Sequence, residues 1–277
     1  LDVGLNYSDD TWMFNASLGM TPQKRAIERK MGKLYADTTM HTIDFQPMIW
    51  VNWKKKEARI TFNYSGRTRQ PSLSDLMPLT DNSNPLYITR GNPDLKQMFS
   101  HSVRVSFQHS KKGISANIGG QMEQNSVTQV VLYDAKTGGR ETSPININGN
   151  WNVYGSANWW KRLGHFSLRL DMNGNHSNRV SMINEDKSLE PKKSTTRDTG
   201  LGCDANVSYQ PTWGGIDFST SWNYQYSLNS INDNDTYTRN YSFRLEGYVD
   251  LPFGLQLRTD GAYSFRNGTN IRRSEEH

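Results

Sequence analysis

Alternating apolar and polar residues run through most of this chain, and the alternation constrains its fold more than any other feature. The stretch FSLRLDMN, residues 166–173, places Phe, Leu, Leu and Met on one face and Ser, Arg, Asp and Asn on the other. A period of two is that of a β-strand, whose successive side chains point to opposite faces. The pattern predicts about twelve strands, near residues 1–8, 11–20, 43–54, 57–65, 101–110, 114–131, 145–160, 166–177, 199–210, 215–227, 240–250 and 255–266.

The predicted strands are long, and the connections between them alternate between short and long. A tilted strand of about 9–11 residues crosses a bilayer. Tight turns on one side and long loops on the other are typical of outer-membrane barrels. We therefore predict an all-β, antiparallel, up-and-down transmembrane β-barrel. The short connections lie near 9–10, 54–56, 111–113, 161–165, 211–215 and 251–254, and the long ones near 21–42, 66–100, 132–144, 178–198 and 228–239.

Composition leaves a large soluble β-protein open as the alternative. Hydrophobic residues make up 34% of the chain and mean hydropathy is −0.79, and no apolar run approaches the roughly 18 residues of a membrane helix. Aromatic residues favour the barrel, because several fall near predicted strand ends, where interfacial girdles lie. The set near the short turns is Trp53, Trp159, Tyr209, Trp213 and Phe253, and the opposite set is Tyr133, Trp151, Tyr226 and Tyr263.

In a barrel the two faces of each strand meet different surroundings. The face of Phe166 is predicted to meet lipid, and the face of Arg169 is predicted to line the interior. Both basic and acidic residues follow the interior parity, so salt-bridged lining is the expected role of these carboxylates. The candidate lumen-lining residues are Arg169, Asp171, Asp204, Arg244, Glu246, Arg258 and Asp260.

Three stretches depart from plain alternation. Pro47 lies inside a predicted strand, and because proline cannot donate to a ladder we expect a bulge or a late strand start there. Residues 114–131 lose their alternation after Met122, so the upper part is expected to rise into a loop. Residues 84–96, NPLYITRGNPDLK, hold two Asn-Pro steps, which predict a rigid, folded loop because each proline excludes helix and each asparagine can close a turn.

The sequence predicts neither an enzyme nor a cofactor or metal protein. The six histidines, His41, His101, His109, His165, His176 and His277, form no helical pair or Cys/His cluster, so we expect no metal site. Serines occur outside any nucleophile-elbow pattern, and Gly138–Arg140 lacks the context of a phosphate-binding loop. Cys203 follows the apolar parity and is expected to act as a small hydrophobe.

The chain is basic, with a formal net charge of +5. Nucleic acid is not an expected partner, because basic residues alternate with acidic ones and the aromatics follow the lipid-facing parity. The basic run at 23–33, QKRAIERKMGK, is expected in an extracellular loop. It is either a solvated loop or a contact with lipopolysaccharide phosphates.

The stretch 66–100, GRTRQPSLSDLMPLTDNSNPLYITRGNPDLKQMFS, resembles the signature of a known family. This is the outer-membrane β-barrel family of Bacteroidota type, related to TonB-dependent receptors. The flanking strands resemble it too, whereas Gln97-Met98 stand where the family often has Pro-Glu. The matching positions are Pro71, Leu76, Pro78, Asp81, Asn84, Pro85, Leu86, Gly91, Asn92, Pro93 and Leu95.

The resemblance implies that residues 1–277 are a partial outer-membrane β-barrel domain, about 12 strands of about 22. A regulatory-like N-terminal domain, a plug, the first and last strands and the TonB-contacting segment would then lie outside them. The expected location is the outer membrane of a Gram-negative cell. The implied partners are outer-membrane lipid and lipopolysaccharide, the inner-membrane TonB complex and a surface lipoprotein.

Function follows from the resemblance as uptake of a solute into the periplasm by a TonB-dependent receptor. A passive pore or a surface adhesin is the alternative among membrane barrels, and a soluble carbohydrate-binding β-protein is the alternative from another class. The loop at 66–100 would either cap the barrel by packing on its neighbours or contact a ligand. The sequence does not identify that ligand.

Overall fold

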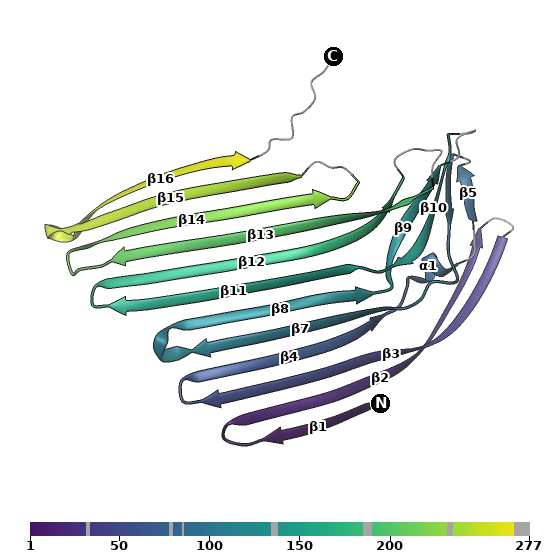
Figure 1. Cartoon of the computed structure of the whole chain (residues 1–277), viewed down its shortest axis with the longest axis horizontal. Helices are drawn as coiled ribbons and strands as arrows, with labels where there is room; N and C mark the ends of the chain where they lie inside the picture. The colour runs from purple at the N-terminus through teal and green to yellow at the C-terminus, as the bar shows by residue number, and fades with distance from the viewer. Residues whose placement is uncertain are drawn as a thin grey trace, which may run out of the picture.

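One antiparallel sheet of twelve strands makes up most of the computed structural model (Figure 1). The structure describes residues 1–31, 34–77, 80–84, 86–133, 138–184, 190–231 and 235–268, without the side chains of 27–31, 34–38 and 81–83. The strands of the large sheet are β1 (Asp2–Ser8), β2 (Trp12–Met31), β3 (Leu34–Lys55), β4 (Ala58–Arg69), β7 (Met98–His109), β8 (Ile114–Gln124), β11 (Asn150–Leu163), β12 (Phe166–Ile183), β13 (Lys192–Tyr209), β14 (Gly214–Asn229), β15 (Thr236–Leu251) and β16 (Leu255–Gly268).

Each strand of the large sheet pairs with the next large-sheet strand along the chain, so the topology is an up-and-down meander. The tight turns all lie at one end, on the left in Figure 1. Two of them contain the short 3-10 helices η1 (Ser110–Lys112) and η2 (Pro252–Gly254). The predicted strand number and the alternation of short and long connections are therefore confirmed.

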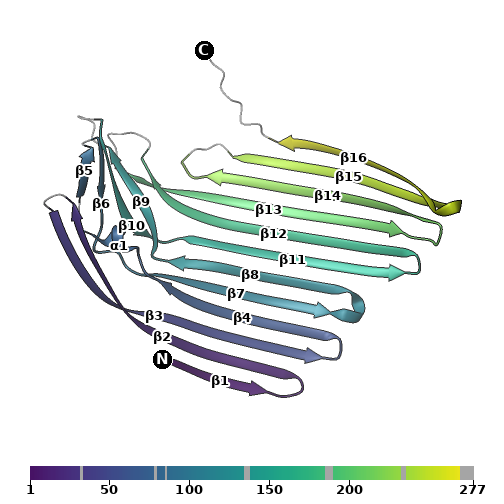
Figure 2. The same ribbon diagram turned by 180° about the vertical axis from the view of Figure 1, so that it is seen from behind.

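The opposite end carries a second sheet, which the sequence analysis did not predict. Its order is β5-β6-β10-β9, and Figures 1 and 2 show it rising from the end of the large sheet. β6 and β10 pair in parallel, although they belong to two different connections. The elements are β5 (Thr80–Asn84), β6 (Tyr87–Arg90), β9 (Ser126–Tyr133) and β10 (Arg140–Ile147), with the short helix α1 (Leu73–Leu76) beside them.

Several predicted boundaries are corrected by the structure. The expected loop at 21–42 is largely an extension of the β2–β3 hairpin, and 178–198 is mostly strand. The predicted strand 114–131 is divided into β8 and β9, so its upper part does leave the large sheet. The strand predicted at 145–160 is likewise divided, into β10 and β11.

The bulge or late start expected at Pro47 is wrong. β3 runs without a register shift past Pro47, which lies opposite Leu18. The N–H of Phe45, two residues before, points to β4 and donates to Thr68 Oγ1 at 2.9 Å, so the nitrogen of Pro47 faces the same side. Because β4 pairs with β3 only from Met48 onward, no ladder donor is required of the proline.

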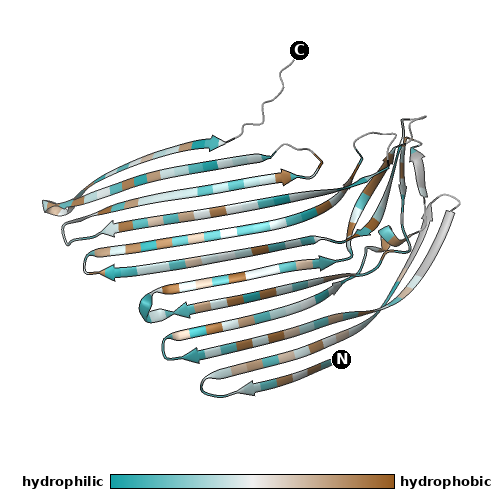
Figure 3. Cartoon of the chain, in the orientation of Figure 1, coloured by the Kyte–Doolittle hydropathy of each residue, from teal (hydrophilic) through white to brown (hydrophobic). Residues whose placement is uncertain are grey.

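The register aligns most apolar positions of the large sheet on one face and most polar positions on the other, with Met13, Trp50 and Trp160 among the exceptions. Phe166 lies opposite Tyr209, and Phe218 lies between Val207 and Leu245. Figure 3 shows the resulting alternation of hydrophobic and hydrophilic residues along each strand. Phe166, Phe218 and Phe243 remain 47%, 41% and 38% exposed, so no second layer covers this face within the described part of the chain.

Apolar burial is concentrated where the two sheets meet. Leu76 and Met77 are each only 2% exposed, and they adjoin the connection that follows α1. The small core stabilises the second sheet and its connections, whereas the large sheet keeps its apolar face outward. The buried apolar residues are Leu76, Met77, Leu95, Met98, Val130, Ile147 and Val180.

Candidate functional site: the polar face and the loop packed on it

The seven predicted lumen-lining residues all share the polar face of β12–β16. The register places Asp171 opposite Asp204 and Glu246 opposite Asp260. Two of the arginines neutralise carboxylates on the same strand: Arg169 bonds to Asp171 at 2.7 Å and Arg244 bonds to Glu246 at 2.5 Å. The third, Arg258, donates to Gln256 Oε1.

A hollow of about 350 Å³ brings three of these residues together. Asp171, Asp204 and Arg244 line it, with hydroxyl and amide groups from β13–β16. The Asp171 carboxylate also accepts from the Asn158 amide on β11. The hollow therefore offers both charges and neutral hydrogen-bonding groups within one polar surface.

Glycines opposite large polar side chains shape this face. A Cβ at Gly119 would meet the hydroxyl of Tyr154 at 2.6 Å, so glycine is what allows the phenol to lie across β8. There Arg104 donates to Tyr154 Oη from Nη2 at 2.9 Å and from Nε at 3.1 Å. The guanidinium lies 5.5 Å from the ring centroid, which adds a cation–π contact.

A polar row crosses eight strands nearer to the long connections. Three hollows of about 250, 310 and 300 Å³ follow it from β4 to β15. Sequence reasoning placed six of the eight members in strands, but it placed Asp198 and Thr236 in long connections and did not identify the row. The row consists of Ser65, Ser102, Gln121, Asn152, Ser177, Asp198, Ser227 and Thr236.

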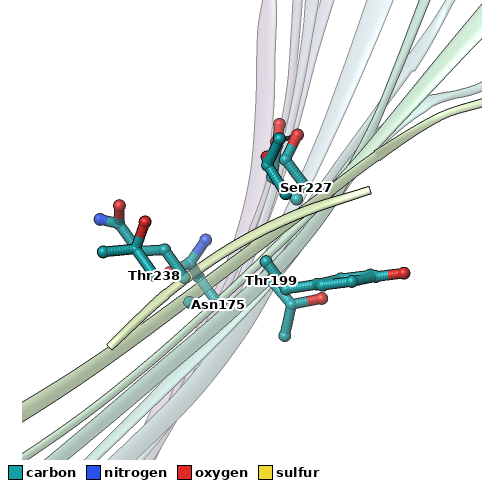
Figure 4. Close-up of a pocket in the computed structure, with 9 residues that line it drawn as sticks. Asn175, Thr199, Ser227 and Thr238 are labelled. Atoms are coloured by element: carbon teal, nitrogen blue, oxygen red, sulfur yellow. Dashed lines mark hydrogen bonds between the residues drawn. The ribbon is translucent and has the colours of Figure 1, made fainter. Parts of the chain in front are cut away.

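Figure 4 shows the hollow at the β12–β15 end of this row. Asp198 accepts a hydrogen bond from Ser227 Oγ at 2.6 Å, and Arg179 bonds to its other oxygen at 2.6 Å. The figure labels four of the lining residues, Asn175, Thr199, Ser227 and Thr238. The hollow is thus lined mainly by polar side chains, together with the ring of Tyr226.

The signature loop is held by backbone contacts that explain its glycine. A Cβ at Gly91 would overlap the carbonyl oxygen of Met77, so only glycine lets the chain pass α1 this closely. The next residue, Asn92, donates its backbone N–H to Asp75 O at 2.6 Å and its amide to Pro144 O at 3.0 Å. Its Oδ1 accepts from the N–H of Asp94 at 3.0 Å, which is the local turn predicted from the Asn-Pro step.

Other signature positions divide between buried and exposed. Pro71, Leu76 and Leu95 are buried, whereas Asn84, Leu86 and Pro93 are exposed. Asn84 closes a second turn by accepting from the N–H of Leu86 at 3.0 Å. For Asp81 the structure describes only the backbone, which pairs with Thr89. Pro78 and Pro85 lie outside the described residues.

The connection that carries this loop packs against the polar face of the extended β2–β3 hairpin. Asp44 is 8% exposed and accepts from Gln23 at 2.8 Å and from Gln70 at 2.6 Å. Arg25 donates to Pro71 O at 2.8 Å. By register, Gln23, Arg25 and Asp44 all lie on the polar side of their strands, so the connection folds over that face at the long-connection end.

Residues 5–197 match the Outer membrane protein beta-barrel family. The match spans β2–β12, the start of β13 and the second sheet, and so includes the signature loop. This chain belongs to that family. A search of curated proteins gives no match.

Family membership places the protein in the outer membrane and excludes the soluble alternative. The height of the apolar face matches the thickness of a bilayer. The His176 ring lies 5.3 Å from that of Trp151 in a tilted arrangement. From Phe166 to His176, ten residues span about 33 Å at ~3.3 Å each. With the strand tilt of about 40° usual in such barrels, this is a band roughly 25 Å tall, the thickness that a bilayer requires.

Aromatic side chains border the band as outer-membrane barrels require. Trp12 and Trp53 lie at the short-turn end with ring centroids 6.4 Å apart, and Phe166 and Tyr209 lie 4.5 Å apart at the same end. Tyr133, predicted for the opposite girdle, lies instead in β9 of the second sheet. The sequence analysis misplaced it because it took β9 as the upper part of one long strand.

Neither metal chemistry nor a membrane helix is indicated by the described residues. Among them, no group of three or more His, Cys, Asp or Glu side chains has a geometry that would hold a metal. No described helix has the length and apolar character needed to span a membrane. Cys203 lies on the apolar face between Met172 and Trp222 and is half-buried.

Of the basic run at 23–33, expected as a solvated loop or a lipopolysaccharide contact, only residues 23–26 have described side chains. Lys24 is exposed and Arg25 binds Pro71 O, as described above. The backbone of 23–31 belongs to β2, so the run continues a strand where a loop was expected. Lys33 lies outside the described residues.

Proposed function

We propose that the barrel takes up a polar solute across the outer membrane in the manner of a TonB-dependent receptor, with this chain supplying wall and loops. The observation that carries the proposal is the combination of an uncovered apolar face with a polar face rich in hydrogen-bonding groups. A structure that only anchors a protein in lipid requires no such continuous polar face.

The packed connection favours a receptor over an open pore. Gln70 and Pro71, at the start of this connection, are fixed to the polar-face side chains Asp44 and Arg25. In the proposed receptor, this connection narrows the opening of the barrel on the extracellular side, where outer-membrane barrels have their long loops. A plug and a TonB-contacting segment would be contributed by chain outside residues 1–277, as the resemblance to TonB-dependent receptors implies.

The ligand class that suits this surface is a polar molecule with many hydrogen-bonding groups. The polar row offers hydroxyl, amide and carboxylate groups in three neighbouring hollows. The loop itself is held by hydrogen bonds and packing within the chain, which account for its buried positions without any ligand. Leu86 and Pro93 of the loop are exposed, and we propose that a ligand contacts the loop there.

Cysteine labelling in intact cells tests the proposal. In a Cys203→Ala background, Asp204→Cys and Ser221→Cys on the polar face should react with a small membrane-impermeant maleimide, and Met172→Cys on the apolar face should not. For an energy-coupled receptor, labelling from outside should increase when the TonB system is active and fall when a protonophore collapses the proton gradient. Labelling that is constant under both conditions would show a passive pore, and equal labelling of the two faces would contradict a barrel with a wet interior.

A further inference from the structure

Exposed cations gather on three consecutive turns of the short-turn rim. These turns join β3 to β4, β7 to β8 and β11 to β12, which are neighbours in the sheet and lie along the left side of Figure 1. No described ion pair involves any of these side chains. The seven residues of this basic rim are Lys54, Lys55, Lys56, Lys111, Lys112, Lys161 and Arg162.

Backbone hydrogen bonds hold the three turns side by side. Ser110 donates its N–H to Glu57 O at 3.0 Å, which joins the first turn to the second. Trp160 donates its N–H to Gly113 O at 2.9 Å, which joins the second to β11. Gly113 has a φ of +64° and a Cβ there would overlap the carbonyl of Trp160. The cations therefore project from a fixed surface.

A hollow of about 570 Å³ opens between the second and third turns. Its lining combines four cations, Lys111, Lys112, Lys161 and Arg162, with Trp159 and Trp160. Trp160 is 55% exposed but lies opposite Arg169 on the polar face, whereas Trp159 lies opposite Leu170 on the apolar face. A site with several uncompensated cations beside indole rings suits a ligand that has both a negative charge and an apolar body.

Position along the strands indicates where that ligand lies. Lys55 and Lys161 follow Trp53 and Trp159 by two residues, so each pair shares the apolar face of its strand. Tryptophan occupies the membrane–water interface of barrels, and the lysine one step farther out reaches the depth of the head groups. The cations thus lie at the level of lipid phosphates.

The rest of the rim differs, so the basic rim is not a general property of the turns. The β1–β2 turn carries Asp9 and Asp10, the β13–β14 turn at 210–213 is uncharged, and the β15–β16 turn follows Asp250. A ring of lysines that only anchors the barrel would be distributed around the rim. Clustering over six adjacent strands instead indicates a local binding surface.

We propose that the basic rim binds the phosphate head groups of anionic phospholipids in the leaflet on the short-turn side, the periplasmic leaflet in barrels of this kind. The lysine and arginine side chains pair with phosphate oxygens. Trp53 and Trp159, which lie on the apolar face, contact the glycerol and upper acyl region. This binding is independent of the proposed solute uptake, because it uses the outer rim and none of the polar-face hollows.

Native mass spectrometry of the full-length barrel tests the proposal. The protein is extracted in a neutral detergent, and retention of added cardiolipin or phosphatidylglycerol is compared with retention of zwitterionic phosphatidylcholine. The quadruple variant K111Q/K112Q/K161Q/R162Q should lose anionic lipid retention by roughly tenfold or more. The matched variant K24Q/R69Q/K96Q/R197Q removes the same charge from the long-connection end and should retain the lipid.

Three other outcomes would contradict lipid binding at the basic rim. Equal loss in both variants would assign the effect to net charge, and retention in the rim variant would place the lipid elsewhere. Displacement of the lipid by excess inorganic phosphate would show a free-anion site in place of a lipid site. Heat-modifiable migration on a gel establishes that each variant is a folded barrel, and a rim variant that fails this check is replaced by the double variant K111Q/K112Q in the same comparison.

Discussion

Lys96 and Asn146, fifty residues apart in sequence, exchange two hydrogen bonds between the signature loop and β10. The Lys96 N–H donates to Asn146 Oδ1 at 2.8 Å, and Asn146 Nδ2 donates to Lys96 O at 3.0 Å. The same amide donates to Asn125 O at 2.9 Å. One side chain therefore joins three segments of the two long connections.

Replacing this amide should release the loop without disturbing the barrel wall. We expect Asn146→Ala to destabilise the docked loop by about 1–3 kcal/mol, because it removes three hydrogen bonds, including the one to the part-buried Asn125 carbonyl. Limited proteolysis should then cut between residues 84 and 97 faster than in the unaltered protein. Asn240→Ala on β15 is the control, and an equal cleavage rate in both variants would contradict the role of Asn146.

A methyl group at Gly91 should have a similar effect by a different route. Gly91→Ala places a Cβ against Met77 O, and overpacking of this kind costs about 1–3 kcal/mol. Hydrogen exchange at the N–H of Asn92, which donates to Asp75 O, should become faster. Gly261→Ala meets no atom within 4 Å and should leave that exchange unchanged.

The two faces of β12 should tolerate charge differently. Met172 lies near the middle of the apolar band, so Met172→Arg should impair barrel assembly by roughly 2–4 kcal/mol, whereas Asn173→Arg on the polar face should have little effect. Refolding into lipid vesicles with a urea titration measures the difference. Similar losses for the two variants would overturn the assignment of faces.

Depth along the strand gives a graded version of this test. Leu168 lies two residues from the start of β12, close to the interface, so Leu168→Arg should cost less than Met172→Arg, about 0–1 kcal/mol. Arg169→Leu should leave assembly intact. A Leu168→Arg variant that matched Met172→Arg would show that the band extends farther toward the short turns than the aromatic border indicates.

The first turn should depend on pH through Asp9. Hydrogen bonds from the backbone N–H of Trp12, from the Tyr7 hydroxyl and from the N–H of Thr11 lower the pKa of the Asp9 carboxyl. The contribution of this group to stability is therefore complete above the ordinary carboxyl pKa of about 3.9 and is lost as pH falls through the lowered value. Exchange at the N–H of Trp12 should accelerate on acidification, and Asp9→Asn should abolish that dependence while Asp10→Asn preserves it.

The large sheet could be predicted from sequence because lipid and lumen impose opposite demands on alternate residues. Phe166 and Arg169 differ in parity, and parity is readable from a single strand. The twelve strands, their antiparallel order and the shared face of the seven charged residues follow from it. Pro47 was misjudged because the position of β4 beside it depends on pairing that the pattern does not contain.

The second sheet could not be predicted by the same reasoning. β5 reads TDNSN and β6 reads YITR, which are too short and too polar to show a period of two. The parallel pairing of β6 with β10 depends on segments about fifty residues apart. In the extended β2–β3 hairpin the alternation fades because, beyond the membrane, neither face is required to be apolar.

That parallel pair also sets an order of events during biogenesis. The chain reaches β6 long before β10 has been synthesised, and β7, β8 and β9 lie between them. Until β10 arrives, Asn92 and Lys96 lack their hydrogen bonds to Pro144 and Asn146, so a newly secreted chain carries this apolar-containing segment undocked. Holding that segment soluble in the periplasm is then a task for a chaperone, and closure of the second sheet marks the moment when the chaperone is no longer needed.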